Sequence, residues 1–301
     1  MVSRSKRIVA PFVTAAIILA AGAGLGGCSS ALYEQNTVAR TGAVRGPTLR
    51  TMARLHMERS APILIRIYKE ENALEVWKQD RSGRFALLST YPICKFSGNL
   101  GPKIATGDRQ APEGFYDIRP EQMNPTSSAY LAFDTGFPNA YDRSLGRTGS
   151  ELMVHGGCSS IGCYAMTDYE IAEIYDLVDE AFKGGQEKVQ LQAFPFRMIA
   201  QNMASHATDP NVPFWKMLKT GSDAFLATGR PPTVAVCDRR YVFNAAVEVD
   251  DLDPTAPCPR GIDSASRTHI EAASWGGANA TPPGPLSLRT ASGEQRTIQA
   301  R

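Results

Sequence analysis

Short hydrophobic runs separated by polar turns dominate the chain from about residue 62 onward. The runs are rich in β-branched and aromatic residues and are bounded by Gly, Pro and other turn formers, which is typical of strands. We expect strands at Ile63–Tyr68, Ala73–Trp77, Phe85–Ile93, Gly114–Ile118, Ala129–Phe133, Glu151–His155 and Lys188–Phe194. The pattern therefore predicts a predominantly β core.

A helix is predicted between the last two of these strands. Thr167 and Glu170 have the spacing of a capping box, in which each side chain binds a free backbone N–H of the first turn. Apolar residues then recur at helical spacing as far as Phe182, and Gly184 can end the helix. Helical spacing also indicates helices at Pro47–Arg59 and Trp215–Ala227.

The amino terminus has the pattern of an export signal. Basic residues precede an apolar run, Ile8 to Leu25, which ends in the sequence L-G-G-C at Cys28. This ending resembles a lipobox, so we expect residues 1–27 to be removed as a signal peptide and Cys28 to be lipidated. A signal anchor is the alternative, since about 20 apolar residues can span a bilayer. We favour the lipobox, and Ser29 favours an exported, periplasm-facing protein anchored to the outer membrane.

Composition and charge exclude some classes of protein. Hydrophobic residues make up 43% of the 301 residues, which is enough for a core and excludes wholesale disorder. The net charge of +2 argues against a nucleic-acid partner. From about Asp250 onward small residues and proline dominate, so residues 251–301 are predicted to be a low-complexity, disordered tail.

If the protein is exported, its six cysteines lie in an oxidising compartment, where they can form disulfides. If Cys28 carries lipid and Cys163 is a nucleophile, four remain, and four cysteines allow three pairings. We favour a pair between Cys237 and Cys258, because both lie in the same late segment. Cys94 and Cys158 are interpreted as small buried apolar residues.

The candidate chemistry lies between His155 and Cys163. His155 lies at the end of a predicted strand, a glycine-rich loop follows, and Cys163 comes just before the capped helix. A thiol must become a thiolate to attack, and a neighbouring imidazole can take its proton. Gly162 would let backbone N–H groups approach an oxyanion, with the N–H of Cys163 as a natural donor. These are the parts that acyl transfer requires.

Two plainer interpretations of this segment compete. Histidine at a strand end and cysteine beside glycine are often structural, and spacing alone does not decide between that role and catalysis. A metal site is the other alternative, with His155, Cys158 and Cys163 as ligands. No C-x-x-C pair and no obvious fourth ligand accompany them, so we expect no metal.

Several separated blocks resemble the L,D-transpeptidase (YkuD-type) catalytic domain. That family carries His-Gly followed by Ser-x-Gly-Cys, which here are His155-Gly156 and the block from Ser160 to Cys163. Gly107–Tyr116 is similar to the family's T-P-x-G-x-Y/F stretch. Gly136–Asp142 and Ser160–Asp168 resemble its YafK-like murein branch. The resemblance spans Pro62 to Met203.

The resemblance implies an α+β fold, predominantly β with a few helices. It divides the chain into a tether and helix (28–61), a catalytic domain (62–203), a C-terminal extension (204–250) and the tail. It also implies that Cys163 is the nucleophile and His155 the base, that Gly156 orients the histidine, and that Ser160 and Gly162 help to shape the oxyanion hole. The implied partners are peptidoglycan stem peptides, and no cofactor is implied.

Two departures from the family pattern leave the acceptor open. Ile161 stands where many members have histidine, and only eight positions separate His155 from Cys163. We therefore keep three hypotheses: a transpeptidase that passes the acyl group to an amine, an amidase that releases a peptidoglycan-bound lipoprotein, and a non-catalytic wall-binding lipoprotein. Possible substrate-binding residues precede or follow the site, although each could equally be a surface or core residue: Arg143, Arg147, Tyr141 and Tyr164.

Overall fold

The computed structural model describes residues 44–245, 252–259, 262, 288–289 and 295–296. The expected signal peptide, the lipidation site Cys28 and most of the expected tail lie outside these residues. Within them, no helix is both long enough and apolar enough to cross a membrane.

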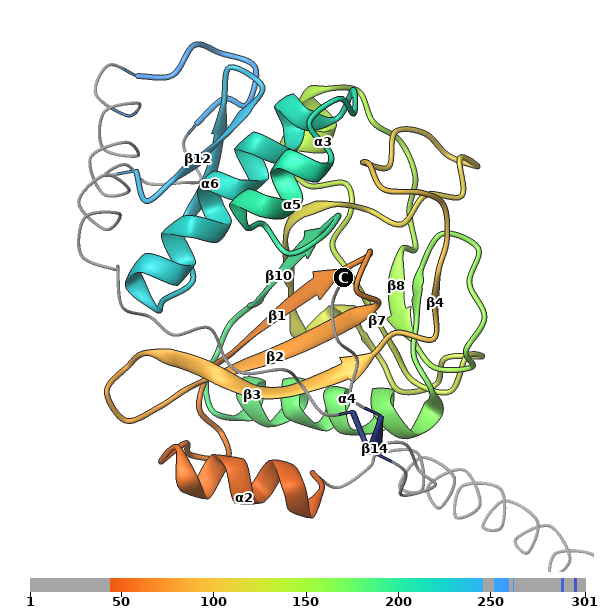
Figure 1. The fold of residues 1–301 in the computed structure, drawn as a ribbon, viewed down its shortest axis with the longest axis vertical. Coiled ribbons are helices and arrows are strands. Elements are labelled where there is room, and N and C mark those ends of the chain that lie inside the picture. The colour runs from red at the N-terminus through yellow and green to blue at the C-terminus, as the bar shows by residue number, and fades with distance from the viewer. Residues whose placement is uncertain (1–43, 246–251, 260–261, 263–287, 290–294, 297–301) are drawn as a thin grey trace, which may run out of the picture.

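A mixed five-stranded sheet forms the centre of the molecule (Figure 1). Its central strand pair is parallel and its other neighbours are antiparallel. Parallel strands need a long crossover connection, and the chain between them supplies the second sheet and a helix. In spatial order the strands are β3 (Phe85–Pro92), β2 (Ala73–Gln79), β1 (Ile63–Tyr68), β10 (Val189–Phe194) and β5 (Gly114–Ile118).

A second sheet of five short strands carries the segment with the candidate chemistry. Its order is β4 (Lys95–Phe96), β9 (Tyr164–Ala165), β8 (Met153–His155), β7 (Ala132–Asp134) and β6 (Met123–Asn124). Helix α4 (Asp168–Lys183) contacts both sheets through strands β1, β7 and β8. Its buried side chains join one hydrophobic core with residues of both sheets.

Most predicted elements are confirmed, and α4 begins with the predicted capping box between Thr167 and Glu170. Two strands are shorter than predicted. Tyr130 and Glu151 have positive φ angles of 73° and 55°, which an extended strand does not allow. The chain therefore enters β7 and β8 later than the hydrophobic pattern indicated.

The C-terminal extension packs onto the central sheet. Helix α6 (Val212–Thr228) contacts strand β12, and aromatic residues from this region join Tyr68, Phe115 and Phe194 of the sheet in a second core. The sequence did not predict whether this region packs against the catalytic domain. The remaining elements are α2 (Gly46–Arg54), the 3-10 turn η1 (Pro120–Gln122), α3 (Ala140–Ser144), α5 (Ala200–Ser205), and the hairpins β11 (Val234–Cys237)–β12 (Arg240–Phe243) and β13 (Leu288–Arg289)–β14 (Gln295–Arg296).

Candidate active site

Parallel strands β8 and β9 bring His155 and Cys163 to one face of the second sheet. His155 is in register with Ala165, so Cys163, two residues before Ala165, lies beside Met153. The Met153 N–H donates to the Cys163 sulfur at 3.4 Å, which agrees with this register. Since side chains two apart along a strand share a face, this register places Cys163 diagonally from His155 on that face.

The Cys163 thiol is partly buried, and it is the free cysteine among the described residues. Its sulfur also donates to the Glu151 carbonyl at 3.7 Å. Burial raises the pKa of this thiol above its ordinary value, and the charge of Asp134 raises it further, whereas the Met153 N–H and the Lys103 ammonium lower it. The resting thiol is thus protonated near neutral pH, and it needs a base to remove its proton.

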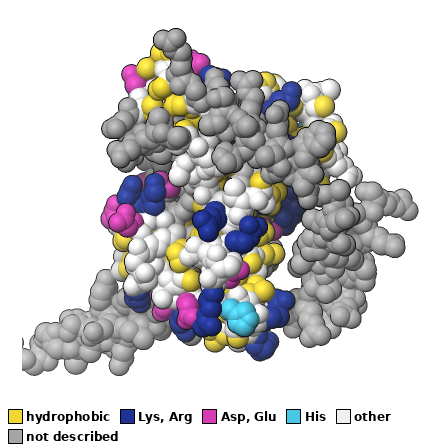
Figure 2. Space-filling model, turned by 90° about the vertical axis from the view of Figure 1, so that its left-hand side faces the viewer, with side chains coloured by type: hydrophobic (Ala, Val, Ile, Leu, Met, Phe, Trp, Pro, Cys, Tyr) yellow, Lys and Arg dark blue, Asp and Glu magenta, His cyan; other side chains and the backbone are white. Residues whose placement is uncertain are grey.

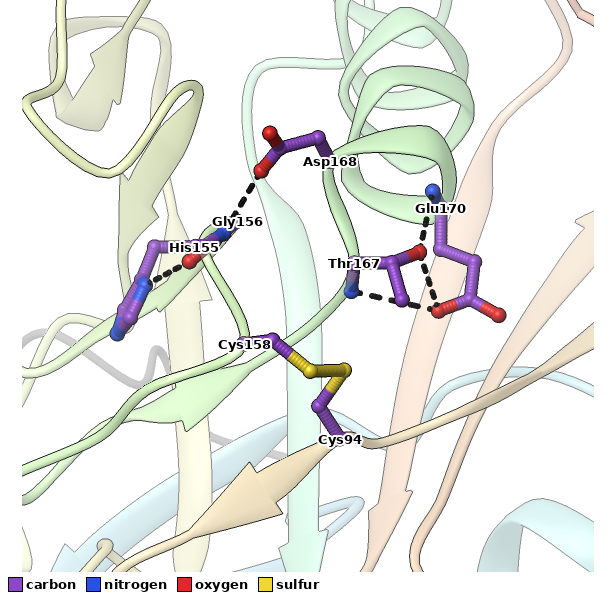
Figure 3. The surroundings of a disulfide bond; sticks show 8 residues. Cys94, His155, Gly156, Cys158, Thr167, Asp168 and Glu170 are labelled. Atoms are coloured by element: carbon purple, nitrogen blue, oxygen red, sulfur yellow. Dashed lines mark hydrogen bonds between the residues drawn. A yellow bond between two sulfur atoms is a disulfide. The ribbon is translucent and has the colours of Figure 1, made fainter.

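His155 is held in one orientation by the backbone of the next residue. Its Nδ1 lies 2.6 Å from the Gly156 carbonyl, which can only accept, so Nδ1 carries the proton and Nε2 is left to act as a base. Gly156 has no room for a side chain, because a Cβ there would lie 2.8 Å from the Ala129 carbonyl. The next N–H, of Gly157, donates to Asp168 at the start of α4 (Figure 3). The histidine therefore rests on a backbone turn fixed to the helix.

Ser160 holds the backbone of Cys163 at both polar groups. Its hydroxyl oxygen accepts from the Cys163 N–H at 2.9 Å and donates to the Cys163 carbonyl at 2.7 Å. The same hydroxyl lies 2.9 Å from that of Ser97, a buried residue that follows β4. The N–H of Cys163, expected to serve as an oxyanion donor, is thus already occupied by Ser160.

Gly162 lies in a conformation that favours glycine, with a φ of 122°. Within the described part of the chain, its N–H has no hydrogen-bond acceptor. This N–H is therefore a better candidate than that of Cys163 for a donor to an oxyanion.

A disulfide joins Cys94, beside β4, to Cys158 in the loop between His155 and Cys163 (Figure 3). The expectation that these two cysteines are free apolar residues is wrong, because folding brings residues 64 positions apart into contact.

The Cys94–Cys158 disulfide also uses the Cys158 sulfur that the alternative metal site needs. Among the described residues no group of three His, Cys, Asp or Glu could hold a metal ion. The favoured pair between Cys237 and Cys258 is confirmed.

The four possible substrate-binding residues do not all lie in one place. Tyr164 is fully buried, and its hydroxyl donates to the Pro112 carbonyl at 2.6 Å, so its expected place in a substrate groove is wrong. Arg143 is exposed and donates to the Pro138 carbonyl. Tyr141 and Arg147 line one groove together, and Arg147 pairs with the buried Asp142 at 2.8 Å.

Three residues that act on the site have no recognisable pattern in the sequence. Ser97 reaches Ser160 from β4, whereas Lys103 and Asp134 act on the thiol through their charges. Lys103 is almost fully buried and pairs with Asp108 at 2.6 Å. Asp134 is in register with Met153, in the same row across the sheet as the thiol. Only the folding of the chain brings these residues to the site.

Comparison with known proteins finds relatives of this chain. Residues 62–191 match the YkuD family model, the L,D-transpeptidase catalytic domain. Two relatives described as "Putative L,D-transpeptidase YafK", from Escherichia coli strain K12 and from E. coli O157:H7, are each 45% identical over 194 residues. The aligned region covers 64% of this chain and 78% of each relative.

Solved structures give a more distant likeness. The helical cell shape determining protein Pgp2 from Campylobacter jejuni shares 17% identity over 76% of this chain and 77% of that chain, with a TM-score of 0.38. Bdellovibrio bacteriovorus Bd1075 shares 20% identity over 47% of this chain and 52% of that chain, with a TM-score of 0.31.

Proposed function

Because this chain belongs to the YkuD family of L,D-transpeptidase catalytic domains, we propose that it is a cysteine-dependent peptidoglycan L,D-transpeptidase. Its substrate is a stem peptide, and its acceptor is an amine of a second stem peptide or of a protein lysine. The observation that carries the proposal is the strand register that places a free thiol, Cys163, diagonally from His155, whose Nδ1 is bonded to the Gly156 carbonyl and whose Nε2 is available as a base.

In the first half-reaction His155 Nε2 takes the Cys163 proton, and the sulfur attacks the carbonyl carbon of the diamino acid, in the amide bond to the terminal residue. A C–S bond forms while the carbonyl oxygen gains negative charge, which the Gly162 N–H stabilises by donating a hydrogen bond. The C–N bond then breaks, and the departing amine takes the proton from His155. The product is a thioester on Cys163.

In the second half-reaction the acceptor amine attacks the thioester carbon. His155 removes a proton from that amine, the C–S bond breaks, and the sulfur regains the proton. The new amide is the cross-link, and the enzyme returns to its starting state with no external oxidant or metal needed.

A second candidate function is an amidase of the same fold, with water as the acceptor. The supporting observation is the short loop between His155 and Cys163, tied down by the Cys94–Cys158 disulfide. Its residue Ile161 is 81% exposed and stands where many members of the family have histidine. Such an enzyme would release a peptidoglycan-bound lipoprotein.

Product analysis separates these candidates. The protein is incubated with disaccharide tetrapeptides and with lipoprotein-linked sacculi, alongside Cys163→Ala, and the products are identified by mass spectrometry. New cross-links that require Cys163 are the expected result. Release of peptide or lipoprotein without new bonds would favour the amidase. No cysteine-dependent product would overturn both and leave a non-catalytic wall-binding protein.

We also propose that Cys28 is lipidated and holds the protein on the outer membrane, facing the periplasm. The support is the L-G-G-C ending of the apolar run, followed by Ser29. Radiolabelled palmitate should enter the wild-type protein and not Cys28→Ala. Equal labelling of the wild-type protein and Cys28→Ala would contradict the proposal.

A further inference from the structure

A groove of about 740 Å³ lies at the boundary between the matched catalytic domain and the C-terminal extension, between the start of α6, strand β12 and the segment around residue 103. Its volume is in the range of small-molecule and peptide sites. The C-terminal extension builds most of its wall, and residues Pro102 and Ile104 close the remaining side. The chemistry described above does not use this groove.

The lining of the groove is strongly basic. It contains Arg147, Lys216, Arg239 and Arg240, and it includes no Asp or Glu among the described residues. Arg147 pairs with the buried Asp142 beneath it, and Arg240 pairs with Asp238 at 3.3 Å. By contrast, acidic and basic side chains are interspersed on the face shown in Figure 2. A concave surface lined by one sign of charge attracts ligands of the opposite charge.

The floor of the groove is aromatic. Tyr141 stacks on Tyr241 at 4.5 Å and on Phe214 at 5.7 Å between ring centroids. The Arg147 guanidinium lies over the Tyr141 and Phe214 rings, at 5.0 and 5.2 Å. Tyr141, Phe214 and Tyr241 are buried, so the packed rings hold Arg147 in place, while the exposed basic side chains take carboxylates. Because the cations come from three separate parts of the chain, their charges suit a ligand with several spaced carboxylates, as in an acidic peptide.

The groove borders the active site through one segment of chain. Pro102 and Ile104 line the groove, whereas the Lys103 side chain between them packs against Gly149 and lowers the pKa of the Cys163 thiol. The Ile104 carbonyl also accepts from the Thr148 N–H, next to Arg147. A ligand in the groove therefore lies on the other side of this segment from the reacting thiol.

We propose that this groove binds the carboxylate-bearing part of a peptidoglycan stem peptide away from the bond that reacts. The inference rests on the proposed function for the identity of the peptide. The groove is a subsite that the C-terminal extension adds to the catalytic domain, with Lys216 and Arg239 binding carboxylates above a packed aromatic floor.

The test compares two double variants of the full chain, each carrying Cys163→Ala to prevent turnover. Lys216→Met with Arg239→Met removes two exposed cations of the groove. The control, Lys219→Met with Arg230→Met, removes the same residue types at positions that do not line it. Binding is measured by calorimetry with a disaccharide tetrapeptide, with the same compound after amidation of its carboxylates, and with inorganic phosphate.

We expect the groove variant to bind the free-acid peptide at least 10-fold more weakly than the control. The amidated peptide should bind both variants equally weakly, and phosphate should not compete at millimolar concentration. Equal affinity of both variants for the free acid would overturn the proposal. Displacement of the peptide by phosphate would also overturn it, because the site would then recognise phosphate.

The two proposals can fail separately. Charge-dependent binding of the peptide with no acyl-enzyme on the wild-type protein would remove only the proposed reaction. An acyl-enzyme that forms normally, together with equal binding by both variants, would remove only the groove.

Discussion

Ser160 connects the Cys163 backbone to the rest of the second sheet through two hydrogen bonds and a contact with Ser97. Ser160→Ala removes both bonds and leaves two polar groups of Cys163 without these partners. We expect a loss of about 1–2 kcal/mol in the free energy of unfolding, since a hydrogen bond contributes about 1 kcal/mol. We also expect at least a 10-fold drop in turnover because the thiol loses its fixed position.

Ser159→Ala is the matched control, because Ser159 is exposed and precedes the residue that holds Cys163. Turnover of muropeptides and urea unfolding are measured for both variants. Equal effects of the two substitutions would show that Ser160 has no special role.

The charges of Lys103 and Asp134 act in opposite directions on the Cys163 thiol. Burial raises its pKa, so its alkylation by iodoacetamide should rise with pH at a midpoint above the ordinary thiol value of about 8.5. Lys103→Met removes a cation that stabilises the thiolate, so the midpoint should move higher. Asp134→Asn removes an anion that destabilises it, so the midpoint should move lower.

The measurement is the rate of modification of the peptide that contains Cys163, from pH 6 to pH 11. Shifts of the two variants in the same direction would contradict this account of the thiol's electrostatics.

At the scale of single residues, the sequence indicated His155 and Cys163 because both lie in one continuous motif with a recognisable spacing. It could not indicate Ser97 or Asp134, since these residues act only through strand pairing. The N–H of Cys163 was expected to face an oxyanion. Only the position of the Ser160 hydroxyl reveals that this N–H already has an acceptor.

The two disulfides belong to different parts of the fold and should differ in their effect on function. Cys94–Cys158 closes a loop of 64 residues and Cys237–Cys258 one of 21, which in the chain-entropy model correspond to about 4 and about 3 kcal/mol. Replacing either pair by Ala should lower stability. Only loss of Cys94–Cys158 should lower turnover at a temperature where both variants remain folded.

Calorimetric melting and turnover at 20 °C test this difference. If the Cys237–Cys258 variant loses as much turnover as the other, the loop disulfide has no particular part in positioning the site.

At the scale of elements, long periodic segments were predictable and short ones were not. Helix α4 has a capping box and four turns of apolar spacing, so both ends were close to their observed positions. Strands β4 and β9 have two residues each, too few to show a period, and they form because they pair with each other. The early parts of the predicted β7 and β8 strands were lost to positive φ angles at Tyr130 and Glu151, which hydrophobicity does not indicate.

A buried ion pair joins the central sheet to the C-terminal extension. Lys69 lies 2.9 Å from Glu113, both side chains are fully buried, and the other Glu113 oxygen accepts from the Trp215 indole of α6 at 3.0 Å. Lys69→Met would leave a buried carboxylate without its counter-charge. We expect a loss of about 3–5 kcal/mol in the free energy of unfolding.

The double variant Lys69→Met with Glu113→Gln should recover part of that loss, because the carboxylate is then neutral. Urea unfolding of the single and double variants measures this recovery. A double variant less stable than Lys69→Met alone would contradict the proposed charge coupling.

At the scale of the molecule, the sequence predicted an α+β fold with a predominantly β core, and the two mixed sheets confirm it. It left the role of the region after residue 203 undecided. That region shares a core with Tyr68 and Phe115, and such long-range packing of aromatic residues has no local pattern in the sequence. Tyr141 and Arg147 were each predicted as possible substrate ligands, and only the fold shows that they line one groove.

The most direct test of the central claim is the mass of the acyl-enzyme. The protein is mixed with a disaccharide tetrapeptide without an added acceptor, quenched in acid within seconds, and measured by intact-mass spectrometry beside Cys163→Ala. We predict an added mass equal to the substrate minus its terminal amino acid, located on Cys163 and absent from the variant. The same adduct on both proteins, or product formation by the variant, would contradict a thioester mechanism at Cys163.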